Sequence, residues 1–318
     1  MLGIRHPVIS SGMMRVSRAE LVAAVANAGA LGFLTALTQP TPEALADEIR
    51  RTRDMTDEPF GVNLTILPSV KPVPYAEYAQ AIIDTGISLV ETAGRSPEPF
   101  MPHFDSAGVR VIHKCTSVKH ALKAQSLGCV AVEIDGFEAA GHPGEDDIPS
   151  LVLLPRAVDA LNIPVIACGG FSDARGLVAA LALGAEGVSM GTRFLATHEA
   201  PVHQNLKQEL VAGSELDTQL IMRKFRNTAR IYKNSVAQKI AQIELQEGTE
   251  FSDVAELVSG ARGETVLQTG DMEHGIWWAG LSQGLIHDIP SVEELISRMI
   301  SEAESIICER LAGLSKSV

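Results

Sequence analysis

One loop of the sequence, residues 133–149 (EIDGFEAAGHPGEDDIP), carries a side chain suited to proton chemistry. A short apolar run ends at Asp135, and a glycine-interrupted loop then presents His142 between Gly141 and Pro143. An imidazole changes charge near neutral pH, and this histidine does not belong to an apolar face. We therefore expect His142 to face a substrate as an acid, a base or a hydrogen-bond donor.

Three acidic residues follow this histidine: Glu145, Asp146 and Asp147. Together with His142 they could suggest a metal site. They follow a turn and precede a predicted helix, however, and carboxylates in that place are more typical of N-terminal caps. The sequence therefore predicts caps here and no metal.

Glycines end two further apolar runs, as Gly169-Gly170 and Gly191-Thr192. Bare amides at such ends could cradle a phosphate, helped by the dipole of the next helix, although both could be tight turns only. Lys114 ends another apolar run. A lysine there could steady an anionic ring, form a Schiff base, or extend its ammonium to the rim of the fold.

Eight apolar segments alternate with helix-like segments at roughly 25-residue spacing. We predict strands over residues 6–14, 30–36, 60–66, 88–93, 109–115, 130–137, 164–170 and 185–195. Ser17 with Glu20 predicts a capping box for the first helix, and Thr41 and Ser117 predict further caps. Regular alternation means parallel strands, and eight units favour a closed (β/α)8 barrel. No GxGxxG follows the first strand, which argues against a Rossmann fold.

The alternation stops after Thr197. We predict a barrel over residues 1–197 and a smaller, mainly helical segment over 198–318 that covers the barrel mouth, its C-terminal part packing back on the barrel. The basic run 222–233 is then either a solvated helix face or a contact for the phosphates of a nucleotide or coenzyme A. Trp277 and Trp278 predict either a pocket wall or an interdomain core.

Composition excludes several classes of protein. The chain has 318 residues, 46% of them hydrophobic, and a formal net charge of −13. This charge argues against nucleic acid or an anionic membrane as partner. No run of about 18 apolar residues predicts a membrane span. The four cysteines have no CxxC spacing and no signal peptide is evident, so we expect a reduced, cytoplasmic protein.

An ordered set of motifs along the chain resembles the nitronate monooxygenase superfamily, formerly the 2-nitropropane dioxygenases. The motifs are GMMRVS (12–17), NLTILPSVKPVPY (63–75), HKC (113–115), IDGFEAAGHPGEDDIP (134–149), CGGFSDARG (168–176), MGTRFLAT (190–197) and GDMEHGIWWAGLSQG (270–284). This resemblance implies an FMN-dependent (β/α)8 barrel. The loops at 63–75 and 134–149 look most like the subgroup of bacterial NADH:quinone reductases.

The resemblance also implies roles for residues at the strand ends. It implies a flavin phosphate site at Gly169, Gly170, Gly191 and Thr192, with a backbone contact at Cys168, where the family often has serine. It implies flavin-ring contacts from Gly12, Met13, Met14, Thr65, Lys114 and Asp135, with Ala140 and Gly141 beside the ring. His142 matches the family's active-site histidine, which is a base in nitronate oxidation. Residues 67–74 would form a proline-rich gate.

The leading hypothesis is an FMN enzyme that takes hydride from NADH or NADPH and passes electrons to a quinone. The alternatives within the superfamily are a nitronate monooxygenase that uses oxygen, and an enoyl-thioester reductase. Outside it stand a Schiff-base aldolase or isomerase using Lys114, and a phosphate-binding protein without turnover. The expected partners are small molecules, and a homodimer is one possible assembly.

Overall fold

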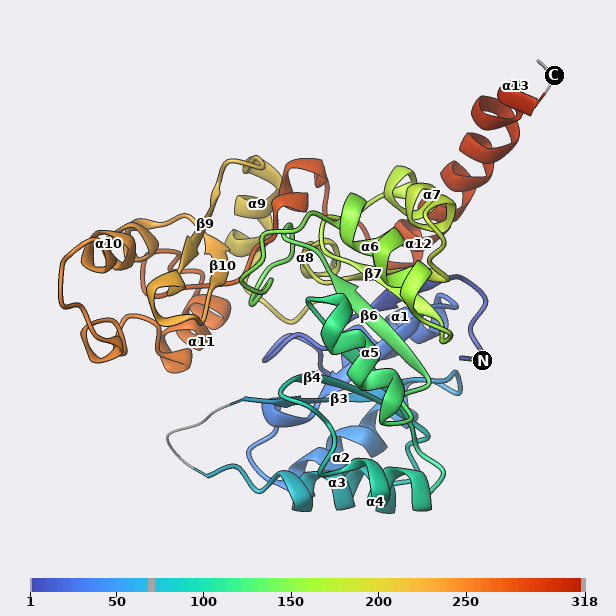
Figure 1. Cartoon of the computed structure of the whole chain (residues 1–318), viewed down its shortest axis with the longest axis horizontal. Coiled ribbons are helices and arrows are strands. Elements are labelled where there is room, and N and C mark those ends of the chain that lie inside the picture. The colour runs from blue at the N-terminus through green and yellow to red at the C-terminus, as the bar shows by residue number, and fades with distance from the viewer. Residues whose placement is uncertain (1, 68–71, 316–318) are drawn as a thin grey trace.

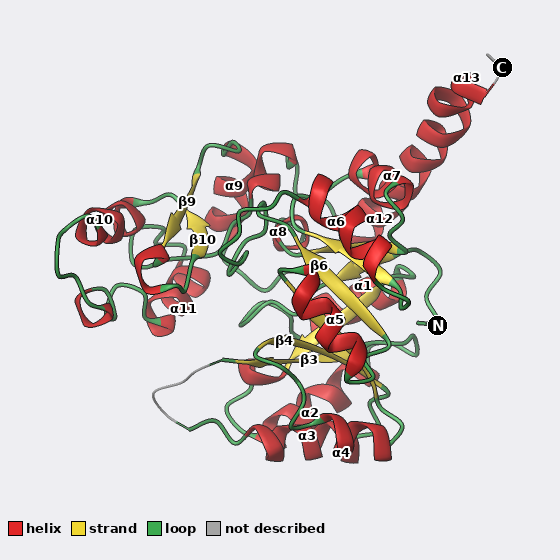
Figure 2. Cartoon of the chain, in the orientation of Figure 1, coloured by secondary structure: helices red, strands yellow, loops and turns green. Residues whose placement is uncertain are grey.

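Eight parallel strands close into a barrel in the computed structural model, which describes residues 2–67 and 72–315 (Figures 1 and 2). The strands are β1 (Val8–Ser10), β2 (Leu31–Thr35), β3 (Gly61–Ile66), β4 (Leu89–Gly94), β5 (Arg110–Cys115), β6 (Ala131–Asp135), β7 (Val165–Cys168) and β8 (Gly187–Met190). Each strand pairs with the next in sequence, and β8 pairs with β1. The predicted (β/α)8 barrel is therefore confirmed.

Several of the predicted strands are shorter than expected, the first and the eighth most of all. The first covers only three residues, because the chain turns after Ser10. The eighth ends at Met190, because residues 192–195 form a short helix. Both ends lie at the barrel mouth, where the loops are irregular.

Helices alternate with the strands and surround the barrel (Figure 2). They are α1 (Ala19–Asn27), α2 (Pro42–Arg53), α3 (Tyr75–Asp84), α4 (Met101–Ser106), α5 (Val118–Ser126), α6 (Ser150–Ala160), α7 (Ala174–Ala182) and α8 (Thr192–Leu195), with a 3-10 turn at Ala36–Thr38. The side chains of Thr41 and Ser117 cap α2 and α5 as predicted.

The predicted capping box at Ser17 and Glu20 is wrong. Helix α1 begins at Ala19 and its N-cap is Arg18, which makes no side-chain cap. The Ser17 hydroxyl instead accepts from the Met13 amide at 2.8 Å and donates to the Ser11 carbonyl at 3.2 Å. Ser17 therefore stabilises the loop after β1, which forms part of the barrel mouth.

The inside of the barrel is divided into an apolar floor and a polar mouth. Side chains alternate along a strand, so every second residue points into the barrel. The floor consists of Ile9, Leu31, Phe33, Leu89, Ile112, Ala131 and Ile166, which form one buried cluster. Two residues beyond Phe33, Leu89, Ile112 and Ala131, the inward positions are the polar residues Thr35, Glu91, Lys114 and Glu133. The polar side chains therefore gather at the carboxyl ends of the strands.

The chain after the barrel contains, among its helices, a β-hairpin that the sequence did not predict. It contains an antiparallel hairpin, β9 (Thr218–Ile221) and β10 (Ala229–Tyr232), beside α9 (Gln204–Ala212), α10 (Ser235–Glu244) and α11 (Gly260–Thr269) (Figure 1). The basic run 222–233 lies in this hairpin and its turn, not on a helix. Met222 and Arg226 both adopt positive φ angles, 60° and 53°, which a helix cannot contain.

The last long helix, α12 (Val292–Ser305), packs against α1 and α7 and so completes the helical ring. The remaining elements are 3-10 turns at Arg223–Phe225, Phe251–Asp253 and Leu281–Leu285, a π-helical stretch at Ile306–Leu311 and α13 (Ala312–Ser315). No helix within the described residues is long and apolar enough to cross a membrane.

Candidate active site

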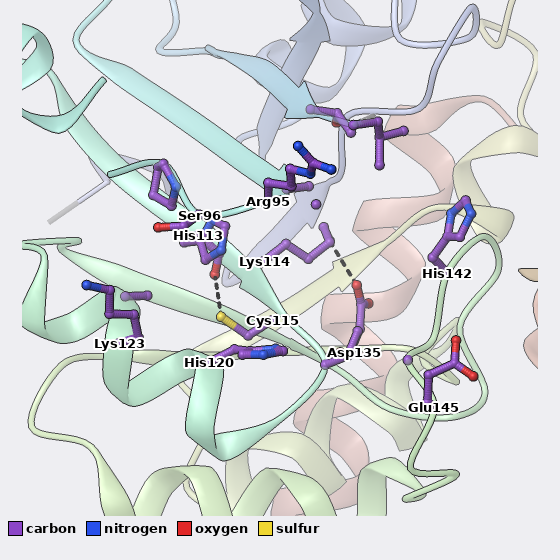
Figure 3. A pocket seen from close by; sticks show the side chains of 18 of the residues that line it. Arg95, Ser96, His113, Lys114, Cys115, His120, Lys123, Asp135, His142 and Glu145 are labelled. Carbon is purple, nitrogen blue, oxygen red and sulfur yellow. Dashed lines mark hydrogen bonds and ion pairs between the residues drawn. The ribbon is translucent and has the colours of Figure 1, made fainter. Parts of the chain in front are cut away.

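A cavity of about 560 Å³ opens at the barrel mouth, above the ends of strands β3 to β6. Five residues that the sequence predicted as site residues line it: Thr65, Lys114, Asp135, Ala140 and His142. Figure 3 shows Lys114, Asp135 and His142 arranged around this space. The proline-rich gate predicted at residues 67–74 lies largely outside the described residues, which exclude 68–71, although Leu67 lines the cavity.

The loop that carries His142 is held by the hairpin. Gly141, with φ of +75°, exchanges two backbone hydrogen bonds with Arg230 of β10. The guanidinium of Arg230 lies over the Phe137 ring, 4.5 Å from its centroid, and donates to the Phe137 carbonyl at 3.0 Å. The position of His142 therefore depends on a strand that follows the barrel in sequence.

The acidic residues after His142 do not cap helix α6, so this prediction is wrong. Glu145 accepts hydrogen bonds from the amide and hydroxyl of Thr228, and Asp147 pairs with Arg223. The cap of α6 comes instead from Glu138, whose carboxylate accepts from the Ser150 amide at 3.0 Å. The acidic stretch thus attaches the loop to the hairpin turn.

His142 faces the cavity and is accessible to solvent through it. Its ring lies 5.8 Å from the ring of Trp278, which is partly exposed, whereas Trp277 is buried and stacks on Tyr232. The surrounding protein atoms partly desolvate the imidazole and so lower the pKa of His142, an effect that Glu145 opposes. A neutral imidazole can accept a proton or donate a hydrogen bond to a carbonyl oxygen.

Lys114 points into the barrel rather than to its rim. Its ammonium donates to the hydroxyl of Ser11 at 2.9 Å and to the carboxylate of Glu133. Burial alone would lower the pKa of Lys114, but the charges of Asp135, Glu133 and Glu91 raise it well above its ordinary value. The amine is therefore held protonated, which argues against a Schiff-base role.

Glu133 and Glu91 are not among the site residues that the sequence predicted. Both are fully buried. Glu133 points inward with Asp135, two residues later on the same strand, and this alternation was the available signal. Cys168 also joins this group, because its sulfur lies 3.3 Å from the Lys114 ammonium.

The glycines after β7 and β8 form a candidate anion cradle. Gly169 and Gly170 have φ angles of +82° and +86°, and a Cβ on Gly169 would lie 2.9 Å from the backbone of Gly136. Among the described residues no acceptor receives the amides of Gly169, Gly170, Gly191 or Thr192. Unpaired amides converging at strand ends suit a phosphate, so the donors fit the group that the resemblance implies.

The loop after β1 lies between the cradle and the cavity. The amide of Gly12 donates to Glu91 at 3.1 Å, and a Cβ on Gly12 would clash with Asn63. A Cβ on Gly191 would lie 3.6 Å from the Met13 sulfur, so Met13 adjoins the cradle. Two side-chain hydrogen bonds lie beside this loop. The Thr38 hydroxyl donates to the Met14 sulfur at 3.8 Å, and the Thr65 hydroxyl donates to the Asn63 side-chain oxygen at 2.8 Å.

Comparison with known proteins agrees with this architecture. The family model "Nitronate monooxygenase" matches residues 1–302. A 5-hydroxy-7a-methyl-1-oxo-octahydro-1H-indene-4-carboxyl-CoA dehydrogenase from Rhodococcus jostii is 31% identical over 95% of this chain and 94% of that protein. A probable nitronate monooxygenase from Staphylococcus aureus is 30% identical over 96% and 97% of the two chains.

Solved structures show the same similarity. FabK from Thermotoga maritima has a TM-score of 0.91 and 33% identity, with 98% of this chain and 97% of that one covered. A nitroalkane oxidase from Streptomyces ansochromogenes has a TM-score of 0.81 and 26% identity, with 95% and 97% covered. On the evidence of its sequence and its fold, the chain belongs to the nitronate monooxygenase family of (β/α)8-barrel oxidoreductases.

Proposed function

We propose that the protein is an FMN-dependent NAD(P)H:quinone reductase. The observation that carries this proposal is the cavity that His142 shares with Lys114. Desolvation lowers the pKa of the imidazole, and neighbouring carboxyl groups raise the pKa of the amine. A hydride transfer needs little acid–base assistance, whereas a quinone oxygen needs a hydrogen-bond donor. His142 supplies that donor, and Trp278 beside it offers an aromatic face to a flat ring.

The residues around the cavity would divide the work of holding FMN. The amides of Gly169, Gly170, Gly191 and Thr192 would take the phosphate. Lys114 would lie at the ring with Thr65, Asp135, Ala140 and the loop at residues 12–14. When bound there, FMN supplies the two-electron chemistry, and a cation beside its ring stabilises negative charge.

Three cations and a histidine at the cavity rim support a phosphate-bearing donor. Arg95 follows β4, His120 and Lys123 lie on α5, and Arg226 lies in the hairpin turn, yet all four line the cavity. Lys123 pairs with Glu98 at 3.1 Å, whereas no ion pair among the described residues involves Arg95 or Arg226. In a chain of net charge −13, this rim suits the diphosphate of NADH or NADPH.

Anaerobic mixing tests the proposal. We expect NADH or NADPH to bleach the flavin absorbance of the purified protein, and a quinone to restore it. Arg95→Ala combined with Lys123→Ala should raise the KM for the nicotinamide donor at least several-fold and leave the KM for the quinone unchanged. Lys119→Ala on the same helix is the matched control, because Lys119 does not line the cavity.

The opposite result is equally clear. If neither nucleotide bleaches the flavin while an alkyl nitronate is oxidised with oxygen, the protein is a nitronate monooxygenase with His142 as base. That activity would also require a neutral imidazole, so the pKa of His142 alone does not separate the two.

A second candidate is a flavin oxidoreductase that acts on a coenzyme A thioester. It is favoured by the Rhodococcus jostii relative, which is named a carboxyl-CoA dehydrogenase, and by the cations at the rim, which could receive the phosphates of coenzyme A. Reoxidation of the prereduced flavin by an enoyl-CoA, but not by a quinone, would select this candidate. The homodimer expected from the sequence stays a prediction, and a mass measurement in solution would test it.

A further inference from the structure

Three buried carboxyl groups surround a single ammonium at the top of the barrel interior. Lys114 Nζ contacts Glu133 directly and lies 3.8 Å from Glu91 Oε1 and 3.9 Å from Asp135 Oδ2. The side chains of Glu91 and Glu133 are 0% exposed, and Lys114 is the one cation that the described residues bring within 4 Å of the three carboxyls. We refer to these four residues as the carboxyl cluster.

The surroundings of Glu91 provide too few donors for a full negative charge. Its Oε2 accepts from the Gly12 amide at 3.1 Å and from the side-chain amide of Asn63. Its Oε1 is buried and has no hydrogen-bond partner in the described structure, and neither has Oε1 of Glu133. A buried, charged oxygen without a hydrogen-bond donor destabilises the folded state more than a buried neutral group without a partner does. Protonation of one carboxyl group therefore lowers the free energy of the folded state.

The charged and titratable groups around Glu91 come from three successive strands, and none comes from the floor of the barrel. Lys114 comes from β5, and Glu133 and Asp135 from β6, while β3 contributes the neutral Asn63. On β7, burial raises the pKa of Cys168 well above its ordinary value, which keeps it a thiol. Beneath lies the apolar floor. With all three carboxyls ionised, the cluster would carry one positive and three negative charges, a net −2.

These conditions favour a neutral Glu91 near pH 7. Burial first, and then the charge of Glu133, raise the pKa of Glu91 to about 8, although Lys114 opposes them. Burial also raises the pKa of Asp135, but Asp135 lines the cavity and lies next to Lys114. A pKa of about 8 means that a small change in nearby charge is enough to change the protonation of Glu91.

We infer that Glu91 is a proton-carrying residue of this site: its carboxyl binds a proton from solvent when negative charge arrives above Lys114, and releases it when that charge leaves. The inference rests on the proposed function, because the charge is that of two electrons delivered by hydride transfer from NADH or NADPH. Glu91 is neither oxidised nor reduced. Only a proton moves, between the carboxyl group and solvent.

Infrared difference spectroscopy on flavin-free protein tests the first part without reference to activity. We expect a protonated-carboxyl band that disappears as the pH rises through about 8, and that is missing in Glu91→Gln. Glu133→Gln should move this titration to lower pH, because it removes the charge that raises it. Glu145→Gln is the control, because Glu145 lies at the cavity but outside the cluster.

Potentiometry on the flavin-loaded protein tests the second part. Above pH 8, the midpoint potential of the wild type should fall with pH more steeply than that of Glu91→Gln. One additional proton per two electrons corresponds to about 30 mV for each tenfold change in proton concentration. Below pH 7 the two slopes should coincide, because Glu91 already carries its proton.

Two results would overturn the inference. One is a protonated-carboxyl band that survives in Glu91→Gln and does not move in Glu133→Gln. The other is equal potential slopes for the wild type and Glu91→Gln at high pH. If NADH and NADPH fail to reduce the flavin but both physical measurements succeed, the proposed function is wrong and the proton site stands.

Discussion

Replacing Glu91 by glutamine should change how the stability of the protein depends on pH. The pKa of Glu91 is raised to about 8 in the folded state, whereas a glutamate in an unfolded chain titrates near its ordinary value of about 4.3. Between these two values the folded state binds one more proton than the unfolded state. The free energy of unfolding therefore decreases as the pH rises through this window, the reverse of a salt-bridged carboxylate.

The size of the effect follows from linkage. Each unit of pH inside the window contributes about 1.4 kcal/mol, and the contribution ends as the pH passes the folded pKa. From pH 5 to pH 8 the wild type should therefore lose on the order of 3 kcal/mol of stability through Glu91. Glutamine keeps the shape and an acceptor for the Gly12 amide but does not titrate, so the variant should not show this loss.

Urea unfolding of both proteins at pH 5, 6.5 and 8 measures the difference. We expect the wild type and Glu91→Gln to be similarly stable at pH 5, and the variant to be more stable by about 3 kcal/mol at pH 8. Titrating groups outside the carboxyl cluster change both proteins alike and cancel in the comparison. A constant difference across the three pH values, or a variant that is less stable at pH 8, would refute a protonated Glu91.

Three further predictions concern the cradle, the hairpin and the cysteines. Gly169→Ala should lose bound flavin on desalting, because its Cβ would lie 2.9 Å from the Gly136 backbone; Gly108→Ala, which also has a positive φ but open space around it, should retain flavin. Arg230→Ala should lower the free energy of unfolding by about 2–4 kcal/mol and make the hairpin sensitive to limited proteolysis, because the buried guanidinium donates hydrogen bonds to both Thr218 and Phe137. Arg223→Ala removes only an exposed ion pair and should lower the free energy of unfolding by less than about 1 kcal/mol. A thiol reagent should label only Cys308 in the folded protein and all four cysteines in denaturant, because the other three are buried; rapid labelling of more than one would contradict the fold.

Sequence patterns were sufficient to predict the barrel and to place most candidate residues at its mouth. Parallel strands buried on both faces read as continuous apolar runs, and their ends were marked by Gly12, Lys114, Asp135 and the paired glycines. The carboxyl ends of such strands share one rim, so order in the chain was enough to bring these residues together. Their roles toward a cofactor stay predictions.

The charge balance of the site could not be predicted in the same way. From the sequence, Lys114 is a single cation at a strand end. It would then act on a bound flavin ring as one isolated positive charge. The structure surrounds it with Glu91, Glu133 and Asp135, which come from two neighbouring strands. The register between paired strands decides which inward-facing residues lie at the same height in the barrel. Register depends on two strands together, so the sequence of a single segment does not predict it.

The hairpin escaped prediction for a related reason. Five basic residues within residues 222–233 resemble an exposed helix face, because charge on a helix is usually solvated. Arg230 is instead 4% exposed, since its guanidinium finds an aromatic ring and a backbone carbonyl on a loop that is 93 residues earlier in the chain. Tertiary contacts of this range override local pattern, and no window around residue 230 contains them.

The same contacts show that the hairpin, which follows the barrel in sequence, helps to position the candidate site. The loop that carries His142 is joined to the hairpin at Gly141 by backbone bonds, at Phe137 by Arg230, and at Glu145 by Thr228. The barrel supplies Lys114 and the glycine amides, whereas the hairpin fixes where the imidazole stands above them. Under the proposed function, cofactor binding and substrate orientation would be determined by different parts of one chain, so a change of acceptor could arise by altering the hairpin without disturbing the cradle.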